Sequence, residues 1–223
     1  LGDVYKRQAY ADEDRFYAIS SAGIFEFDIS TGITELIYDF QNGHSYSSLV
    51  YNTDNHLVLI DQQTGSIVTF SLDTNSVISE VVVGTQTPGD LTYYQGNLIF
   101  QSSNNLEVIA YDGTEIKSVG CPGSNWFWGL SNYMIDCADN LVLGFNAVGK
   151  VYEFDTEEQI FLEVDDLTSE IGAIYGSTTI NEQFAYDCPL VDLEEAYCDF
   201  LREDRFFICE YDTATQTNSI KMM

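Results

Sequence analysis

Positive charge is scarce in this sequence. Only 8 of the 223 residues are lysine or arginine, against 36 aspartates and glutamates, so the formal net charge is −28 at pH 7. A surface this acidic repels the phosphate groups of nucleic acids and of acidic lipid headgroups. We therefore expect no nucleic acid partner and no insertion into a membrane.

Long apolar runs and metal-ligand motifs are also lacking. No apolar stretch reaches the roughly 18 residues that a membrane-spanning helix needs. The sequence has 2 histidines and no C-x-x-C pair, so we expect neither a histidine-rich metal site nor a cysteine zinc site. No cofactor is expected, although the acidity leaves calcium open.

Cysteine is present in an odd number, at positions Cys121, Cys137, Cys188, Cys198 and Cys209. The short interval between Cys188 and Cys198 would suit a loop closed by a disulfide in an exported protein. The alternative is that the cysteines are free and pack as small apolar residues. Both interpretations stay open on the sequence alone.

The first residues do not begin with Met, and LGDVYKRQ resembles the translated adapter sequence found at the ends of genes assembled from environmental reads. We expect residues 1–14 to be a non-native or disordered leader. On this interpretation the chain is a metagenomic fragment of a longer protein.

One strand signature returns along the chain. Five segments share an apolar residue, a spacer, an aromatic residue and, in most cases, Asp and a turn: IFEFDISTG, IVTFSLDTN, EVIAYDGTE, KVYEFDTEE and FICEYDTAT. Their aromatic anchors are Phe27, Phe70, Tyr111, Phe154 and Tyr211, at intervals of 43, 41, 43 and 57 residues. Apolar residues alternate with other residues around each anchor, which is typical of β-strands. We interpret the last interval as an ordinary unit with an insertion of 14 residues.

Each unit predicts four antiparallel strands. In the second unit, strand-like residues 47–51 and 56–60, the anchor strand that starts at Ile67, and residues 77–83 are separated by turn residues. Four such strands every 41 to 43 residues are the period of a β-propeller blade, in which radial stacking buries both faces of each sheet. A β-sandwich is the alternative, but it does not require the signature to return at this spacing.

We therefore predict an all-β chain with a single β-propeller domain over residues 15–223. The expected units are 15–42, 43–84, 85–123, 124–168 and 169–223. The innermost strand of the first unit would fall within the leader, so a closed ring of five would lack one strand. The fold prediction is about five blades of four antiparallel strands in an incomplete ring.

The strand starts and ends resemble a known family. Gly96-Asn97-Leu98 and Asp139-Asn140-Leu141 start strands, and FDISTG from Phe27 and YEFDT from Tyr152 end them. This pattern, over about residues 15–220, resembles the secreted bacterial propellers of the YVTN and WD40-like superfamily, which are abundant in large Bacteroidetes surface proteins. The resemblance implies export and a binding role rather than a reaction. The Gly-His and Trp-Asp pairs of true WD40 repeats do not recur here, so an intracellular scaffold role is not implied.

Two regions are candidates for ligand contact. Trp126, Phe127 and Trp128 connect the third unit to the fourth, where aromatic rings can stack on a sugar or an apolar peptide. The alternative is that they fill the gap between two blades. The insertion falls within residues 186–204, and long loops on a rigid scaffold often carry specificity. Its candidate contact residues are Asp187, Glu194, Glu195 and Tyr197.

An aspartate follows most anchors, at Asp28, Asp112, Asp155 and Asp212. A ring of these carboxylates would bind cations. We instead expect each carboxylate to accept hydrogen bonds from the backbone of its own turn.

The sequence is compatible with three functions: a binding module, a metal-dependent hydrolase and a structural spacer. We interpret the chain as a non-catalytic extracellular or cell-surface binding module of a larger protein, with a protein or carbohydrate ligand. The alternative is a metal-dependent, lactonase-like hydrolase with its site at the central channel, which needs at least three ligand groups around one point. Asp54, Asn55, Asp139 and Asn140 are its candidates, but turn chemistry also explains them. A purely structural spacer would show no pocket and no exposed aromatic cluster.

Overall fold

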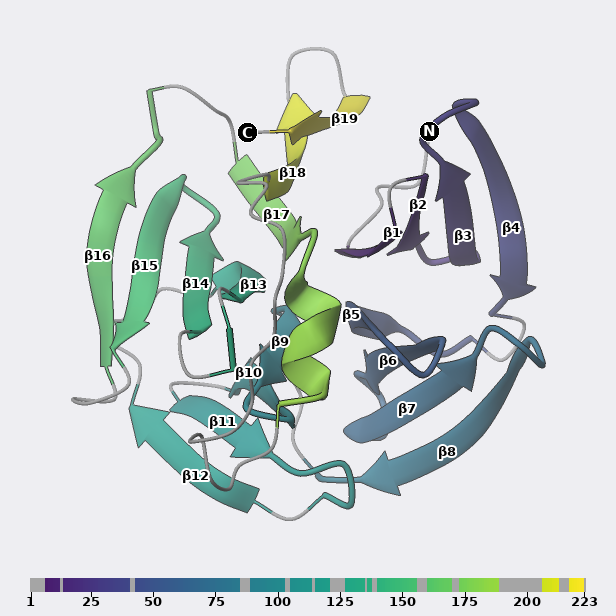
Figure 1. Ribbon diagram of the computed structural model, residues 1–223, viewed down its shortest axis with the longest axis horizontal. Coiled ribbons are helices and arrows are strands. Elements are labelled where there is room, and N and C mark those ends of the chain that lie inside the picture. Colours follow the sequence, from purple (N-terminus) through teal and green to yellow (C-terminus); the bar gives the residue numbers. More distant parts are fainter. Residues whose placement is uncertain are drawn as a thin grey trace.

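A computed structural model gives the arrangement of the chain (Figure 1). It describes residues 7–12, 14–40, 43–84, 89–102, 105–113, 115–120, 127–134, 136–137, 140–155, 160–169, 173–188, 206–212 and 217–222. Five antiparallel sheets stand around a central axis, and strands that follow one another in sequence are paired within each sheet. None of the described helices is long and apolar enough to cross a membrane.

Four of the sheets are four-stranded blades whose strands run in sequence order from the axis outward. Blade 1 comprises β1 (Arg7–Asp12), β2 (Arg15–Ile19), β3 (Gly23–Asp28) and β4 (Ile33–Asp39). Blade 2 comprises β5 (Tyr46–Asn52), β6 (His56–Asp61), β7 (Ser66–Ser71) and β8 (Ser76–Val82). Blade 3 comprises β9 (Leu91–Tyr94), β10 (Asn97–Ser102), β11 (Asn105–Ile109) and β12 (Glu115–Gly120). Blade 4 comprises β13 (Phe127–Met134), β14 (Asn140–Asn146), β15 (Lys150–Asp155) and β16 (Ile160–Asp166).

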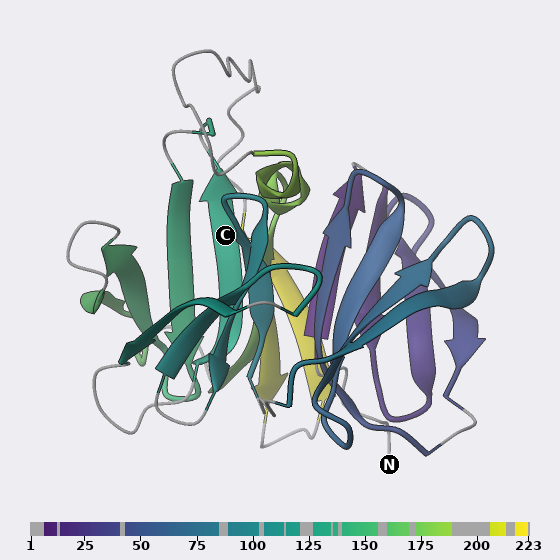
Figure 2. The ribbon, with the colours of Figure 1, turned by 90° about the horizontal axis from the view of Figure 1, so that it is seen from below.

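The fifth sheet differs from the blades. Within the described residues it has three strands, β17 (Ala173–Thr179), β18 (Phe206–Asp212) and β19 (Thr217–Met222). A 3₁₀ helix, η1 (Glu182–Tyr186), lies in the chain between β17 and β18. It stands over the axis of the ring in Figure 1 and at one end of the strands in Figure 2.

The prediction of about five four-stranded blades in an incomplete ring is wrong. The described residues form four such blades, and the three-stranded sheet closes the ring because β17 lies beside β1, where the Tyr10 N–H donates to Thr178 Oγ1 at 3.2 Å. The prediction assigns one four-stranded blade to each of the five aromatic anchors. The strand that carries Tyr211 pairs directly with β17, so the interval of 57 residues is not an ordinary unit with an insertion.

The innermost strand of blade 1 comes from residues that we expected to form part of a leader. Residues 7–12 form β1, which pairs with β2 from Arg7↔Ile19 to Asp12↔Arg15. The ring therefore does not lack this strand. Whether the first residues are native stays a prediction.

The hydrophobic core lies between neighbouring sheets. Alternate side chains of β6 point to opposite faces: Leu57 and Leu59 pack with blade 1, whereas Val58 and Ile60 pack with blade 3. A strand buried on both faces needs apolar residues at successive positions, and the run LVLI meets this need. Similar packing joins blade 3 to blade 4 and blade 4 to the fifth sheet.

The sheets converge near the axis, and this favours small residues on the inner strands. A Cβ atom built on Gly129 of β13 would lie 2.8 Å from Ser177 Oγ and 3.0 Å from the Ser177 backbone nitrogen. Any larger residue at position 129 would push β13 away from β17. Serine and threonine recur on the inner strands, and they also provide hydroxyl groups for hydrogen bonds between neighbouring sheets.

The inner edges are satisfied largely by side chains of the next sheet, because an inner strand has no strand partner on that side. The Ser48 hydroxyl donates to the Gly89 carbonyl at 3.0 Å, and Asn132 Nδ2 donates to the Tyr93 carbonyl at 2.7 Å. The Thr179 hydroxyl donates to the Asn132 carbonyl. These bonds and the Tyr10–Thr178 bond connect one sheet to the next.

Replacing Gly129 with alanine tests the close approach of β13 and β17. We expect Gly129→Ala to lower the free energy of unfolding by about 1–3 kcal/mol, because the new methyl group meets backbone atoms that cannot rotate away. Urea denaturation measures the change. Ser79→Ala on the exposed face of β8 is the control, and an equal loss in both variants would contradict the close contact.

Candidate functional site

Residues 181–188, which we call the channel plug, lie over one end of the ring's axis (Figures 1 and 2). The plug contains η1, whose Glu182, Gln183 and Ala185 side chains are buried. Ala185 and Cys188 belong to the same core cluster as Val50 of blade 2 and Leu98 of blade 3. The plug is therefore packed into the ring and is not a loose surface loop.

Asn181 fixes the start of the plug to blade 4. Its side-chain Nδ2 donates to the Met134 carbonyl, and its Oδ1 accepts from the Met134 N–H at 3.4 Å. The amide group thus satisfies both backbone groups of the last residue of β13, as a neighbouring strand would.

Gly96 fixes the middle of the plug to blade 3. Its N–H donates to the Ala185 carbonyl at 3.0 Å, and its φ of +71° lies in the left-handed region. A Cβ atom at this position would lie 2.6 Å from the Cys188 carbonyl oxygen. Glycine is required here both by the backbone conformation and by the plug above it.

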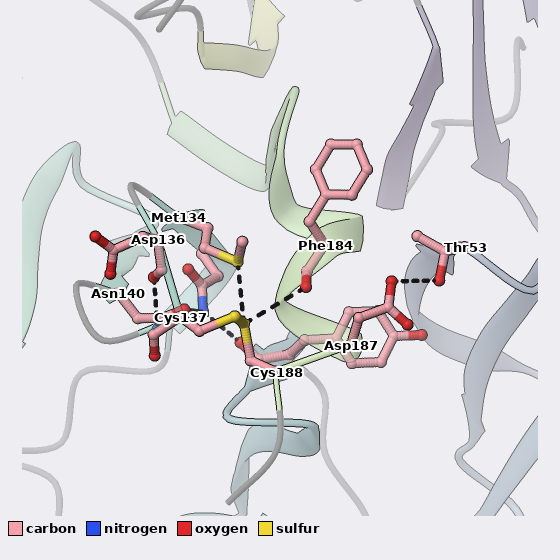
Figure 3. Close-up of a disulfide and its surroundings, with 10 residues drawn as sticks. Thr53, Met134, Asp136, Cys137, Asn140, Phe184, Asp187 and Cys188 are labelled. Carbon is pink, nitrogen blue, oxygen red and sulfur yellow. Dashed lines mark hydrogen bonds between the residues drawn. A yellow bond between two sulfur atoms is a disulfide. The ribbon is translucent and has the colours of Figure 1, made fainter. Parts of the chain in front are cut away.

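A disulfide fixes the end of the plug. Cys188 is bonded to Cys137 in the loop after β13, with a Cα–Cα distance of 5.3 Å (Figure 3). The sequence left open a pairing of Cys188 with Cys198; the fold instead pairs Cys188 with a cysteine 51 residues away in sequence. In Figure 3, Cys188 Sγ also lies near Met134 and the Phe184 carbonyl.

Glu182 places a carboxyl group inside the ring. Its side chain is only 3 % exposed, and it accepts hydrogen bonds from the Thr92 hydroxyl of β9 and from the Thr178 hydroxyl of β17, the latter at 2.8 Å. Burial raises the pKa of Glu182 to about 8, and the charge of Asp90 adds to this effect, while the hydrogen bonds from Thr92 and Thr178 oppose it. Much of the Glu182 population is therefore neutral at pH 7.

Three tyrosines meet between the plug and blade 3. The rings of Tyr93 and Tyr111 each lie with their centroids 5.5 Å from that of Tyr186. Tyr93 is fully buried, whereas Tyr111 and Tyr186 are half-buried. The half-buried rings give this face an aromatic surface that solvent can reach.

Carboxylates lie at the edge of this aromatic group. The Tyr186 hydroxyl donates to Asp54 Oδ2 at 2.7 Å, and the Thr53 hydroxyl donates to Asp187 Oδ2 at 2.8 Å. Asp54, Thr53 and Asp187 are exposed. The bond to Asp54 raises the pKa of Tyr186 to about 12. We call Thr53, Asp54, Tyr111, Tyr186 and Asp187 the plug-side surface.

The structure places the predicted contact residues in different environments. Phe127 is buried in the core between blades 3 and 4, and Trp128 is half-buried. Asp187 lies on the plug-side surface, bonded to Thr53. The predicted Trp126, Glu194, Glu195 and Tyr197 lie outside the described residues. Ligand contact by these residues stays a prediction.

The lactonase-like alternative requires a metal centre, and the described residues do not form one. The residues placed there bring together no group of three or more histidine, cysteine, aspartate or glutamate side chains that could hold a metal ion. Asp54 is bonded to Tyr186, Asn55 Nδ2 donates to Asp73, and Asn140 Nδ2 donates to the Cys137 carbonyl. Asp139 lies outside the described residues.

The turn role expected for the recurring aspartates is confirmed at Asp28. Its Oδ1 accepts from the Ser30 hydroxyl at 2.6 Å and from the Thr31 N–H at 2.9 Å. These bonds lower the pKa of Asp28. In blade 2, Asp61 has a related role after β6, accepting from the Gln63 N–H at 2.8 Å and hydrogen-bonding His44.

Most of the plug-side surface and the buried carboxyl group of Glu182 were not predictable from the sequence. Glu182 is one of 36 acidic residues, and no motif sets it apart. The three tyrosines come from distant parts of the chain, so no local spacing joins them. One signal was available: the small polar residues of the inner strands, as in SSL from Ser47 and GSTT from Gly176, indicate a close approach at the axis.

No protein-family model and no curated protein matches this sequence. Solved structures match it in fold. A Bacteroides caccae protein of unknown function superposes with a TM-score of 0.55 at 14 % identity, over 96 % of this chain and 73 % of that chain. A chain of the mitotic checkpoint complex has a TM-score of 0.56 at 12 % identity, with 98 % of this chain and 64 % of that chain covered.

The WD40 domain of Pan2 from Neurospora crassa is a third match, with a TM-score of 0.52 at 8 % identity over 93 % of this chain and 59 % of that chain. The chain thus spans less than two thirds of the checkpoint and Pan2 chains. Identities this low show the fold alone. The fold is that of a β-propeller, similar to WD40 domains and to the Bacteroides protein.

Removing the disulfide tests its contribution. We expect Cys137→Ala/Cys188→Ala to lower the free energy of unfolding by about 2–4 kcal/mol, because the crosslink closes a long loop in the unfolded chain. Urea denaturation measures the loss. A reductant should destabilise the wild type and leave the double variant unchanged, and a Cys188–Cys198 peptide in a non-reduced digest would contradict the pairing.

The buried carboxyl of Glu182 makes stability depend on pH. The folded-state pKa of about 8 lies above the usual value near 4.3, so the folded protein holds a proton that the unfolded chain has lost. Stability therefore falls as pH rises from about 4.5 to 8, by at most about 1.4 kcal/mol per pH unit. Glu182→Gln should flatten this slope in urea denaturation, and an unchanged slope would contradict it.

Proposed function

We propose that this chain is a non-catalytic binding module of a larger surface or secreted protein, and that it binds a protein or carbohydrate ligand on the plug-side surface. The β-propeller fold is commonly an interaction module. The observation that carries the proposal is that the plug brings the rings of Tyr111 and Tyr186 and the carboxylates of Asp54 and Asp187 together on one surface.

The chemistry of the surface suits recognition. Tyr186 and Tyr111 offer half-buried rings, which stack on sugar rings or on apolar side chains with little loss of conformational freedom. Asp54 and Asp187 each use one carboxylate oxygen within the protein. Their other oxygens can accept hydrogen bonds from ligand hydroxyl or N–H groups.

The rigidity of the surface supports the same proposal. Tyr186 is the last residue of η1 and Asp187 follows it, and this segment is held by the Gly96–Ala185 hydrogen bond and the Cys137–Cys188 disulfide. Residues held in this way lose little entropy when a ligand binds. A disulfide also suits an oxidising compartment outside the cytosol, which supports the proposed extracellular or cell-surface location.

A binding screen with surface variants tests the proposal. Arrays of defined glycans and peptides identify ligands, and calorimetry then measures Kd for the wild type, Tyr186→Ala and Asp54→Asn. We expect both variants to raise Kd at least about tenfold, equivalent to about 1.4 kcal/mol. Glu80→Gln on the exposed outer strand β8 is the matched control for the lost charge and should leave Kd unchanged.

Two results would contradict the proposal. Equal Kd values in wild type and variants would place ligand binding on another face. Hydrolysis of a lactone or ester substrate by the wild type with a divalent cation added, lost in Asp54→Asn, would favour the metal-dependent enzyme.

A further inference from the structure

Glu182 is the deepest ionisable group of the channel plug. It is the first residue of η1, and its two carboxyl oxygens accept from different sheets, one from Thr92 of blade 3 and one from Thr178 of the fifth sheet. The backbone of Asn132 in blade 4 also bonds this carboxyl group. A single carboxyl group therefore joins the plug to three of the five sheets.

The surroundings of Glu182 disfavour a negative charge. On the β9 side, Asp90 opposes ionisation of Glu182, and the buried Tyr93 also interacts with it. The hydrogen bonds from Asn132 of β13 and Thr178 of β17 favour the charged form, and burial outweighs them.

Charged side chains at the C-terminal ends of two inner strands, β5 and β1, interact with other residues. After β5, Asp54 is bonded to Tyr186. At the end of β1, Asp12 pairs with Arg15 at 2.5 Å, and both side chains are exposed. No cationic group is among the main influences on the carboxyl of Glu182 within the described residues.

We propose that Glu182 is a proton-operated latch on the channel plug: its neutral carboxyl holds the plug on the ring, and its ionisation beside Asp90 drives the start of the plug outward into water. The hydrogen bonds from Thr92 and Thr178 position the carboxyl group and favour its charged form, and burial outweighs them. Ionisation of Glu182 would bury a second negative charge beside Asp90, and the free-energy cost of burying this charge opens the latch.

The other attachments decide how the plug moves. Cys188 is held covalently by Cys137, and Tyr186 is bonded to Asp54. The end of the plug therefore stays on the ring while Asn181 and Glu182 leave it. The movement is a hinge, and it exposes the polar groups of the inner strands, such as the hydroxyl groups of Thr92 and Thr178, to solvent.

The difference in the pKa of Glu182 between the closed and the open plug sets the pH range over which the plug opens and the direction of the change. The open plug has a hydrated Glu182 with an ordinary pKa near 4.3, whereas in the closed plug the pKa is about 8. The opening equilibrium constant thus rises between these values, by up to about tenfold per pH unit, and levels off above pH 8. Acid closes the latch and mild alkali opens it.

Amide hydrogen exchange over pH 5–9 tests the latch in the intact, disulfide-bonded chain. After correction for the chemical exchange rate, protection of the 182–185 amides should fall by up to about tenfold per pH unit up to pH 8 in the wild type. Amides of β6 should keep their protection. Glu182→Gln, which keeps the shape without the charge, should show plug protection that does not change with pH.

Two further variants sharpen the test. Glu107→Gln changes another buried glutamate, one that is bonded to Ser102 away from the plug, and should behave as the wild type. Asp90→Asn removes the neighbouring charge and should move the pH at which opening levels off to a lower value. If Glu182→Gln does not fold, this shift alone decides the test.

Three results would overturn the proposal. The first is the same pH dependence in the wild type and Glu182→Gln. The second is an Asp90→Asn profile that coincides with that of the wild type. The third is restored plug protection at pH 8 when CaCl₂ is added to the wild type but not to Glu182→Gln, because the carboxyl group would then hold a cation and not a proton.

Discussion

The structure depends on hydrogen bonds to the backbone N–H and carbonyl groups along the inner edges of its sheets. An inner strand has a partner on one side only, and its remaining backbone groups face the crowded axis where water has little access. Side chains of the next sheet take the place of a partner strand, as Ser48 does for Gly89 and Asn132 does for Tyr93. Each of these bonds joins two sheets. The same requirement that keeps the backbone paired therefore also joins the ring.

The channel plug extends this principle to the end of the ring. Asn181 pairs with both backbone groups of Met134, and Ala185 accepts from Gly96. These contacts turn a loop between β17 and β18 into part of the core, with a neutral carboxyl group beneath it and tyrosine rings beside it. The proposed binding surface and the proposed latch are two faces of this one segment. The proposed ligand surface is its outer side, and the proposed response to protons belongs to its inner side.

The sequence predicted the parts of the fold that depend on neighbouring residues. The alternation around Phe70 predicted a strand, and Asp28 predicted its own turn, because both patterns are complete within a few residues. The number of blades was not predictable in this way, since it depends on β18 pairing with β17. The partner of Cys188 likewise depends on the three-dimensional position of Cys137.

The disulfide also determines what a protease can release. Cys137 and Cys188 enclose β14, β15, β16 and β17 in one covalent loop. A single cut between them leaves the two pieces of chain attached to each other. Cleavage of an exposed turn in blade 4, such as the one before Lys150, would therefore nick the molecule without freeing a fragment.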